Sequence, residues 1–102
     1  MIPDKIKVDS AAIEMFCRRH GVQELSLFGS VLRDDFAPGS DVDVLIALTP
    51  GGSMSAEKYL DMCDELSALF GGRDIDLVQK RLLKNPFRRH EILTTREVVY
   101  AA

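Results

Sequence analysis

Three aspartates and a glycine-serine pair stand at spacings that could support phosphate chemistry on a metal ion. Gly29-Ser30 is followed, after ten residues, by Asp41-Val42-Asp43, and Asp76 lies inside a later apolar segment. Side chains alternate along a strand, so Asp41 and Asp43 would project from one face, about 6.5–7 Å apart. These carboxylates would repel each other unless a cation lay between them, and such oxygen ligands suit Mg²⁺. Asp76, with waters and phosphate oxygens, would complete an octahedral set.

Gly29 and Ser30 are suited to receive a phosphate. Glycine lets the backbone approach a phosphate where any Cβ would obstruct it. Ser30 offers a hydroxyl beside the free N–H groups that begin the next turn. The pair therefore predicts a phosphate-binding turn next to the proposed metal site.

Strand and helix patterns alternate around these residues. Asp9 or Ser10 can cap a helix over 10–20, Ser55 caps a second that ends at Gly71-Gly72, and Asn85-Pro86 begins a third that runs to about residue 94. A short helical turn is expected over 31–36. Strands are expected over 23–28, 41–48 and 73–79, and residues 97–100 either form a short strand or continue the third helix. The pattern predicts an α/β or α+β class with a small twisted sheet flanked by helices, in a single domain over residues 1–102.

The bulk composition excludes several classes of protein. A net charge of −3 argues against long nucleic acid as the main ligand, although a basic stretch covers residues 80–96. Cys17 and Cys63 lie in apolar helical patterns without a zinc-type spacing and are expected to be reduced core thiols. No apolar run is long enough for a signal peptide or a membrane span, so we expect a cytoplasmic protein that does not bind membranes.

The arrangement resembles the nucleotidyltransferase superfamily that includes DNA polymerase beta, and more closely its minimal (MNT) branch. The resemblance rests on Gly29-Ser30, Arg33, the stretch 40–46 and Asp76-Leu77-Val78, and it extends to the closing segment 85–100. Neither a Gly-Ser pair nor an Asp-x-Asp motif is specific alone. The ten-residue spacing, the flanking strands and the third aspartate together make the match specific, and they imply the nucleotidyltransferase fold with a small mixed sheet.

This resemblance implies a displacement at the α-phosphate of a triphosphate, with two Mg²⁺ ions and loss of pyrophosphate. Asp41 and Asp43 would bridge both ions, and Asp76 would bind the ion that activates the acceptor hydroxyl and could receive its proton. Gly29 and Ser30 would hold the β and γ phosphates. Arg33 would add charge there, or would simply be a solvated arginine on a short helix.

Many members of the minimal branch are antitoxins that adenylylate a tyrosine of a HEPN ribonuclease toxin. The resemblance therefore implies ATP as the AMP donor and a HEPN-type toxin as the partner. Another hypothesis remains open, in which the chain is a non-catalytic antitoxin that neutralises its partner by forming a complex. A glycosyltransferase would also use Asp-x-Asp, but it needs a larger sugar-nucleotide domain and leaves Gly29-Ser30 unexplained.

Two features of the sequence depart from a simple match. Asp34 and Asp35 follow Arg33, and they would weaken nucleotide binding if both pointed toward the triphosphate. Asp74 shares a strand face with Asp76 by alternation, so the choice of Asp76 rests on the family pattern and on its deeper position in the strand.

Overall fold

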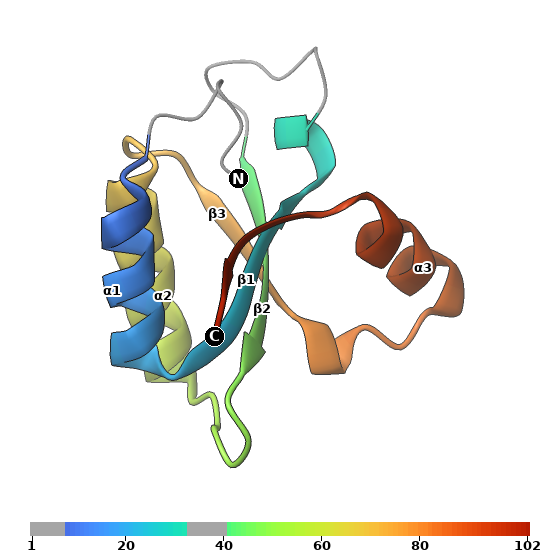
Figure 1. Cartoon of the computed structure of the whole chain (residues 1–102), viewed down its shortest axis with the longest axis horizontal. Coiled ribbons are helices and arrows are strands. Elements are labelled where there is room, and N and C mark those ends of the chain that lie inside the picture. Colours follow the sequence, from blue (N-terminus) through green and yellow to red (C-terminus); the bar gives the residue numbers. More distant parts are fainter. Residues whose placement is uncertain (1–7, 33–40) are drawn as a thin grey trace.

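A four-stranded mixed sheet with helices on both faces forms the chain, as described for residues 8–32 and 41–102 in a computed structural model (Figure 1). In chain order the elements are α1 Ser10–His20, β1 Val22–Phe28, the 3-10 turn η1 Gly29–Leu32, β2 Val42–Leu48, α2 Ala56–Leu69, β3 Ile75–Gln79, the 3-10 turn η2 Lys80–Leu82, α3 Pro86–Thr95 and β4 Glu97–Ala101. The strand order is β3-β2-β1-β4. The β2–β3 pair is parallel, and β1 pairs antiparallel with both β2 and β4. The predicted α+β class is confirmed.

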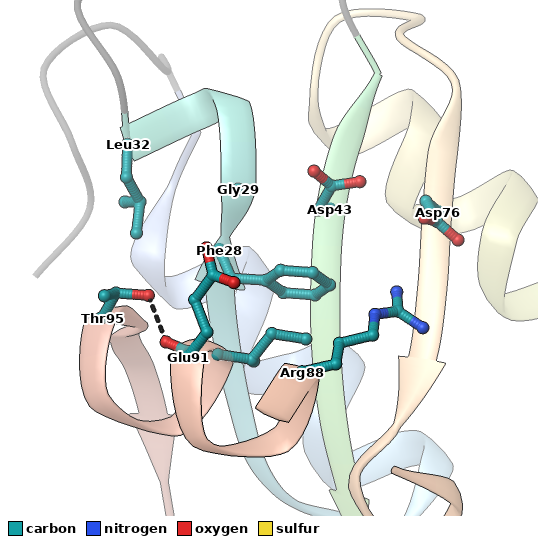
Figure 2. Close-up of a pocket in the computed structure, with 9 residues that line it drawn as sticks. Phe28, Gly29, Leu32, Asp43, Asp76, Arg88, Glu91 and Thr95 are labelled. Carbon is teal, nitrogen blue, oxygen red and sulfur yellow. Dashed lines mark hydrogen bonds between the residues drawn. The ribbon is translucent and has the colours of Figure 1, made fainter. Parts of the chain in front are cut away.

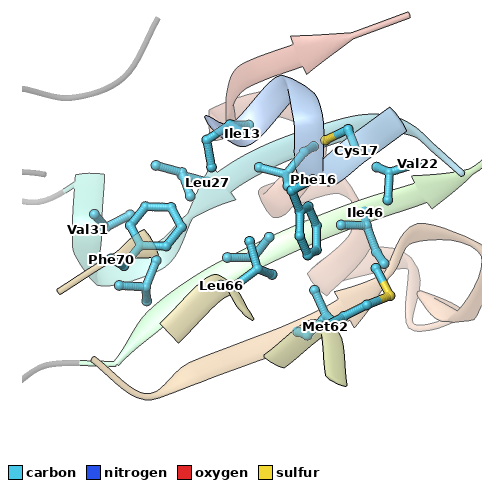
Figure 3. Packing of buried hydrophobic residues seen from close by; sticks show 14 residues of the cluster. Ile13, Phe16, Cys17, Val22, Leu27, Val31, Ile46, Met62, Leu66 and Phe70 are labelled. Carbon is cyan, nitrogen blue, oxygen red and sulfur yellow. The ribbon is translucent and has the colours of Figure 1, made fainter. Parts of the chain in front are cut away.

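The main hydrophobic core lies between the sheet and the helices α1 and α2. Figure 3 shows Phe16 of α1 and Met62 and Leu66 of α2 packing against strand residues such as Leu27 and Ile46. All five side chains are buried. The helical residues recur at the spacing of one helix face, which is why these two helices cover the same side of the sheet.

A second, smaller cluster lies on the opposite face, under α3. It consists of Phe28, Leu45, Leu83 and Ile92. Because strand side chains alternate, the β2 residues next to Leu45 point into the main core, whereas Asp43, two positions away from Leu45, points to the α3 face. The strand pattern therefore places a carboxylate on the side of the sheet that α3 covers only in part.

The ends of the helices follow the capping signals of the sequence. Asp9 Oδ1 accepts from the Ala11 N–H at 2.9 Å and caps α1, and Ser55 Oγ accepts from the Lys58 N–H at 3.1 Å and caps α2. Asn85 caps α3 by accepting from the backbone N–H of Phe87 at 3.0 Å and of Arg88 at 3.2 Å.

Several further expectations can be compared with the structure. The last segment is a strand, because it pairs with β1, which settles the choice left open for residues 97–100. The predicted turn over 31–36 begins earlier, at Gly29, and its residues 33–36 lie outside the described residues. Cys17 and Cys63 are free thiols, and burial raises the pKa of Cys17 to about 12. Within residues 8–32 and 41–102, no helix has both the length and the apolar character to cross a bilayer.

Candidate functional site

The pairing of three strands brings Phe28, Asp43 and Asp76 into one row on the α3 face. Phe28 at the end of β1 is the register partner of Asp43 on β2. Asp43 is in turn the parallel register partner of Asp76 on β3. Side chains of directly paired residues lie on the same face of a sheet. The fold therefore sets two carboxylates from neighbouring strands next to each other, beside the point where β1 ends.

A cleft of about 600 Å³ lies between this row and α3. It is lined by Phe28, Gly29, Leu32, Asp43, Asp76, Arg88, Glu91, Ile92 and Thr95. Figure 2 shows the Asp43 carboxylate between Gly29 and Asp76, with the α3 side chains opposite. The cleft thus combines three apolar side chains, Phe28, Leu32 and Ile92, with a larger number of polar and charged ones, which suits a charged small molecule.

The charge of Asp43 is poorly compensated in this setting. Burial is the largest influence and raises the pKa of Asp43, followed by the negative charge of Asp76 and by a hydrogen bond shared with that residue. Asp41 adds a smaller effect in the same direction. The backbone N–H of Ser30 donates to the Asp43 carboxylate and lowers the pKa. A cation bound between Asp43 and Asp76 would therefore be stabilised by their negative charge.

Position 29 favours glycine for two reasons, namely its backbone conformation and the close approach of the Asp43 side chain. The φ of 72° at Gly29 lies in the left-handed region, which side chains disfavour. A Cβ at this position would overlap Asp43 Oδ2 and would lie 3.2 Å from Asp43 Cγ. The sequence suggested that glycine leaves room for a phosphate; in the structure the space beside Gly29 holds the Asp43 carboxylate.

The predicted site residues have different positions in the structure. Gly29, Asp43 and Asp76 line the cleft, and Ser30 reaches it through its backbone N–H. Asp41 precedes β2, is exposed and does not line the cleft. Within the described part of the chain, no three carboxylate, histidine or cysteine side chains are grouped closely enough to hold a metal ion. Arg33 lies outside the described residues, as do Asp34 and Asp35.

The side chains of Asp43 and Asp76 are suitable ligands for a divalent cation. Both are carboxylates on adjacent strands, and hard cations such as Mg²⁺ are commonly held by one or two carboxylates together with waters and phosphate oxygens. Asp74, the alternative to Asp76, is exposed and does not line the cleft. Its position in the fold therefore also favours Asp76 over Asp74 as the metal ligand.

Four cleft residues come from α3 and were not predicted from the sequence. These are Arg88, Glu91, Ile92 and Thr95. Their spacing of i, i+3, i+4 and i+7 places them on one helix face, so this stripe was a usable signal. It was missed because residues 80–96 were considered only as one basic stretch and not by their helical spacing.

Comparisons with known proteins agree on one family and one fold. The pattern of the nucleotidyltransferase domain family matches residues 10–99. The protein adenylyltransferase MntA of Thermococcus cleftensis is 38% identical over 82 residues, which cover 80% of this chain and 77% of that protein. A solved structure provisionally identified as a minimal nucleotidyltransferase is 31% identical, with a TM-score of 0.69 and 86% of each chain covered. A crystal structure of a toxin-antitoxin with AMP-PNP matches in fold at a TM-score of 0.72 and 18% identity, covering 93% of this chain and 75% of that chain.

Proposed function

Because this chain belongs to the nucleotidyltransferase domain family, we propose that it transfers AMP from ATP to a hydroxyl group of a partner toxin, and so acts as an antitoxin. The acceptor that we propose is a tyrosine of a HEPN-type toxin. The 38% identical relative is a protein adenylyltransferase, and a structure of the same fold is a toxin-antitoxin with the ATP analogue AMP-PNP, which supports this choice of donor and partner. We place the reaction in the cytoplasm, within one nucleotidyltransferase domain over residues 1–102.

The in-register pair of Asp43 and Asp76 beside the Gly29-Ser30 turn is the observation that carries the proposal. Asp43 and Asp76 would hold Mg²⁺, and Asp41 is near enough for its charge to act on Asp43. When bound, Mg²⁺ neutralises phosphate charge and lowers the pKa of the acceptor hydroxyl. Burial is the main cause of the raised pKa of Asp43, and the negative charge of Asp76 adds to it; a cation at this pair would offset both, which supports the proposal.

The residues of this chain then have separate roles. The Ser30 N–H already donates to Asp43, so we assign the Ser30 hydroxyl as the donor to an oxygen of the β or γ phosphate. Asp76 would orient the acceptor hydroxyl and take its proton. The acceptor oxygen forms a bond to the α-phosphorus while the bond to the pyrophosphate oxygen breaks. Arg33 is proposed to add positive charge beside the triphosphate.

An experiment on a co-purified complex tests the proposal. The chain and its partner toxin are exposed to Mg²⁺ and each of the four nucleoside triphosphates, and the mass of the toxin is measured. We expect a mass increase of one or more AMP units with ATP, which is lost in Asp76→Asn and kept in Asp74→Asn. Asp74 is a matched control because it is an exposed aspartate two positions away that does not line the cleft.

The same samples separate catalysis from simple binding. If the wild-type chain neutralises the toxin without any mass change, and Asp43→Asn neutralises it equally well, then the chain acts as a binding module and the transferase proposal is wrong. Equal labelling by Asp76→Asn and wild type would remove the role that we assign to Asp76.

A further inference from the structure

The α3 wall of the cleft carries one cationic side chain among its described lining residues, namely Arg88. The other charged groups there are the carboxylates of Asp43, Asp76 and Glu91. A triphosphate adds further negative charge to a site that is already acidic, so a protein cation would have a large effect in it. Within residues 8–32 and 41–102, no carboxylate forms an ion pair with the Arg88 guanidinium.

Local structure holds Arg88 in this position. Its backbone N–H donates to the Asn85 cap at 3.2 Å, which fixes the first turn of α3. The next residue, Arg89, donates from Nη1 to the Lys80 carbonyl at 3.3 Å and ties that turn to η2. Ile92, one turn further on, is buried in the small cluster under α3. The helix therefore presents Arg88 to the cleft from a fixed base.

The direction of the side chain indicates which part of a nucleotide it would meet. Figure 2 shows Arg88 extending toward β3, on the Asp76 side of the cleft and away from Gly29. If the β and γ phosphates lie at the Gly29-Ser30 turn, the guanidinium is placed for the phosphate next to the carboxylate pair, which is the α-phosphate. Guanidinium groups bind phosphate oxygens through two parallel hydrogen bonds.

We propose that Arg88 is a catalytic residue that binds the α-phosphate and stabilises the charge that develops on its oxygens during transfer. This inference rests on the proposed function. The acceptor oxygen bonds to the α-phosphorus, the bond to pyrophosphate breaks, and the acceptor proton passes to Asp76. Arg88 itself stays protonated throughout and donates hydrogen bonds only. A donor that meets the charge developing on the α-phosphate oxygens acts mainly on the rate of the chemical step.

The test compares Arg88→Ala and Arg88→Lys with Lys84→Ala, which removes the same charge from an exposed residue that does not line the cleft. Calorimetric titration gives the Kd of Mg-AMP-PNP, and transfer to the toxin gives kcat. For Arg88→Ala we expect a loss of about 100- to 1,000-fold in kcat with a much smaller change in Kd. Arg88→Lys should recover part of the rate, and Lys84→Ala should match the wild type.

A second readout reports on the α-phosphate itself. The two diastereomers of ATPαS carry sulfur in place of one or the other non-bridging α-oxygen. The wild type should discriminate between them by kcat/KM, and Arg88→Ala should reduce that discrimination. Circular dichroism checks folding, and if Arg88→Ala fails to fold, Arg88→Lys carries both readouts.

Several results would overturn the assignment. Equal kcat in Arg88→Ala and Lys84→Ala would mean that Arg88 does not act on the reaction. A weaker Kd with unchanged kcat and unchanged discrimination would place the side chain on another part of the nucleotide. If the wild-type chain neither binds Mg-AMP-PNP nor transfers label, the proposed function itself fails, and this is seen before any variant is compared.

Discussion

Replacing Gly29 by alanine tests whether this glycine is needed because Asp43 lies against it. Gly71 provides the matched control: its φ is 74°, against 72° at Gly29, but a Cβ at Gly71 would meet no atom of the described residues within 4 Å. Both substitutions force alanine into the left-handed region, which costs about 1–2 kcal/mol. Only Gly29→Ala also drives the Asp43 side chain away from its place.

The extra cost at Gly29 can be estimated from the contact that is lost. The displaced Asp43 carboxylate gives up the hydrogen bond from the Ser30 N–H, and a hydrogen bond to a charged group is worth about 1.5–3 kcal/mol. In a domain of this size, 1 kcal/mol corresponds to about 4–8 °C in Tm. We therefore expect Gly71→Ala to lower Tm by about 4–16 °C, and Gly29→Ala to lower it by at least about 6 °C more.

Thermal unfolding followed by circular dichroism measures both variants, alone and in an Asp43→Ala background. The additional loss at Gly29 should disappear in that background, because the overlapping carboxylate is gone, while the effect of Gly71→Ala should not change. Transfer activity should fall in Gly29→Ala and stay near the wild-type value in Gly71→Ala. If the two glycine variants lose the same stability in both backgrounds, the contact with Asp43 has no energetic importance and the reasoning is refuted.

Three further predictions follow from single residues. The pKa of Asp43 is raised in the folded chain, so the stability that this carboxyl contributes is complete below its ordinary pKa of 3.8 and is lost as the pH rises through its folded pKa. Urea titrations at neutral pH should therefore find Asp43→Asn more stable than the wild type. Added Mg²⁺ should stabilise the wild type but not this variant. Asn85→Ala should cost about 1 kcal/mol by uncapping α3, and should weaken Mg-AMP-PNP binding; unchanged Tm would contradict the cap. The buried Ser26 hydroxyl has no hydrogen-bond partner among residues 8–32 and 41–102, so Ser26→Ala should unfold at a temperature no lower than the wild type. A clear loss in Tm would show that this hydroxyl has a partner.

The sequence was sufficient to predict the elements and the carboxylates, because the signals for them are local. Helix caps such as Asp9, Ser55 and Asn85, and the alternation that separates Asp43 from the apolar residues around it, depend on neighbours a few positions away. The boundary of β2 was placed one residue too early. Asp41 lies just before the strand and does not line the cleft, but its charge still acts on Asp43, and its role at the metal site stays a prediction.

The features that escaped prediction depend on contacts between distant segments. Asp43 and Asp76 were expected to meet at one metal site, but the parallel strand register that pairs them directly is not specified by any local pattern. Residues 97–100 form a strand because β1 offers an edge, whereas their own sequence is compatible with two structures. Arg88 and Glu91 become cleft residues only because α3 folds back over the sheet.

Transfer of radioactive label tests the central claim most directly. The chain, its partner toxin and Mg²⁺ are incubated with ATP labelled at either the α or the γ phosphorus, and the label on the toxin is measured for wild type and for Asp43→Asn. We expect that the α label, but not the γ label, reaches the toxin with the wild-type chain, and that neither does with Asp43→Asn. Transfer of the γ label, or equal α labelling by the variant, would contradict this claim.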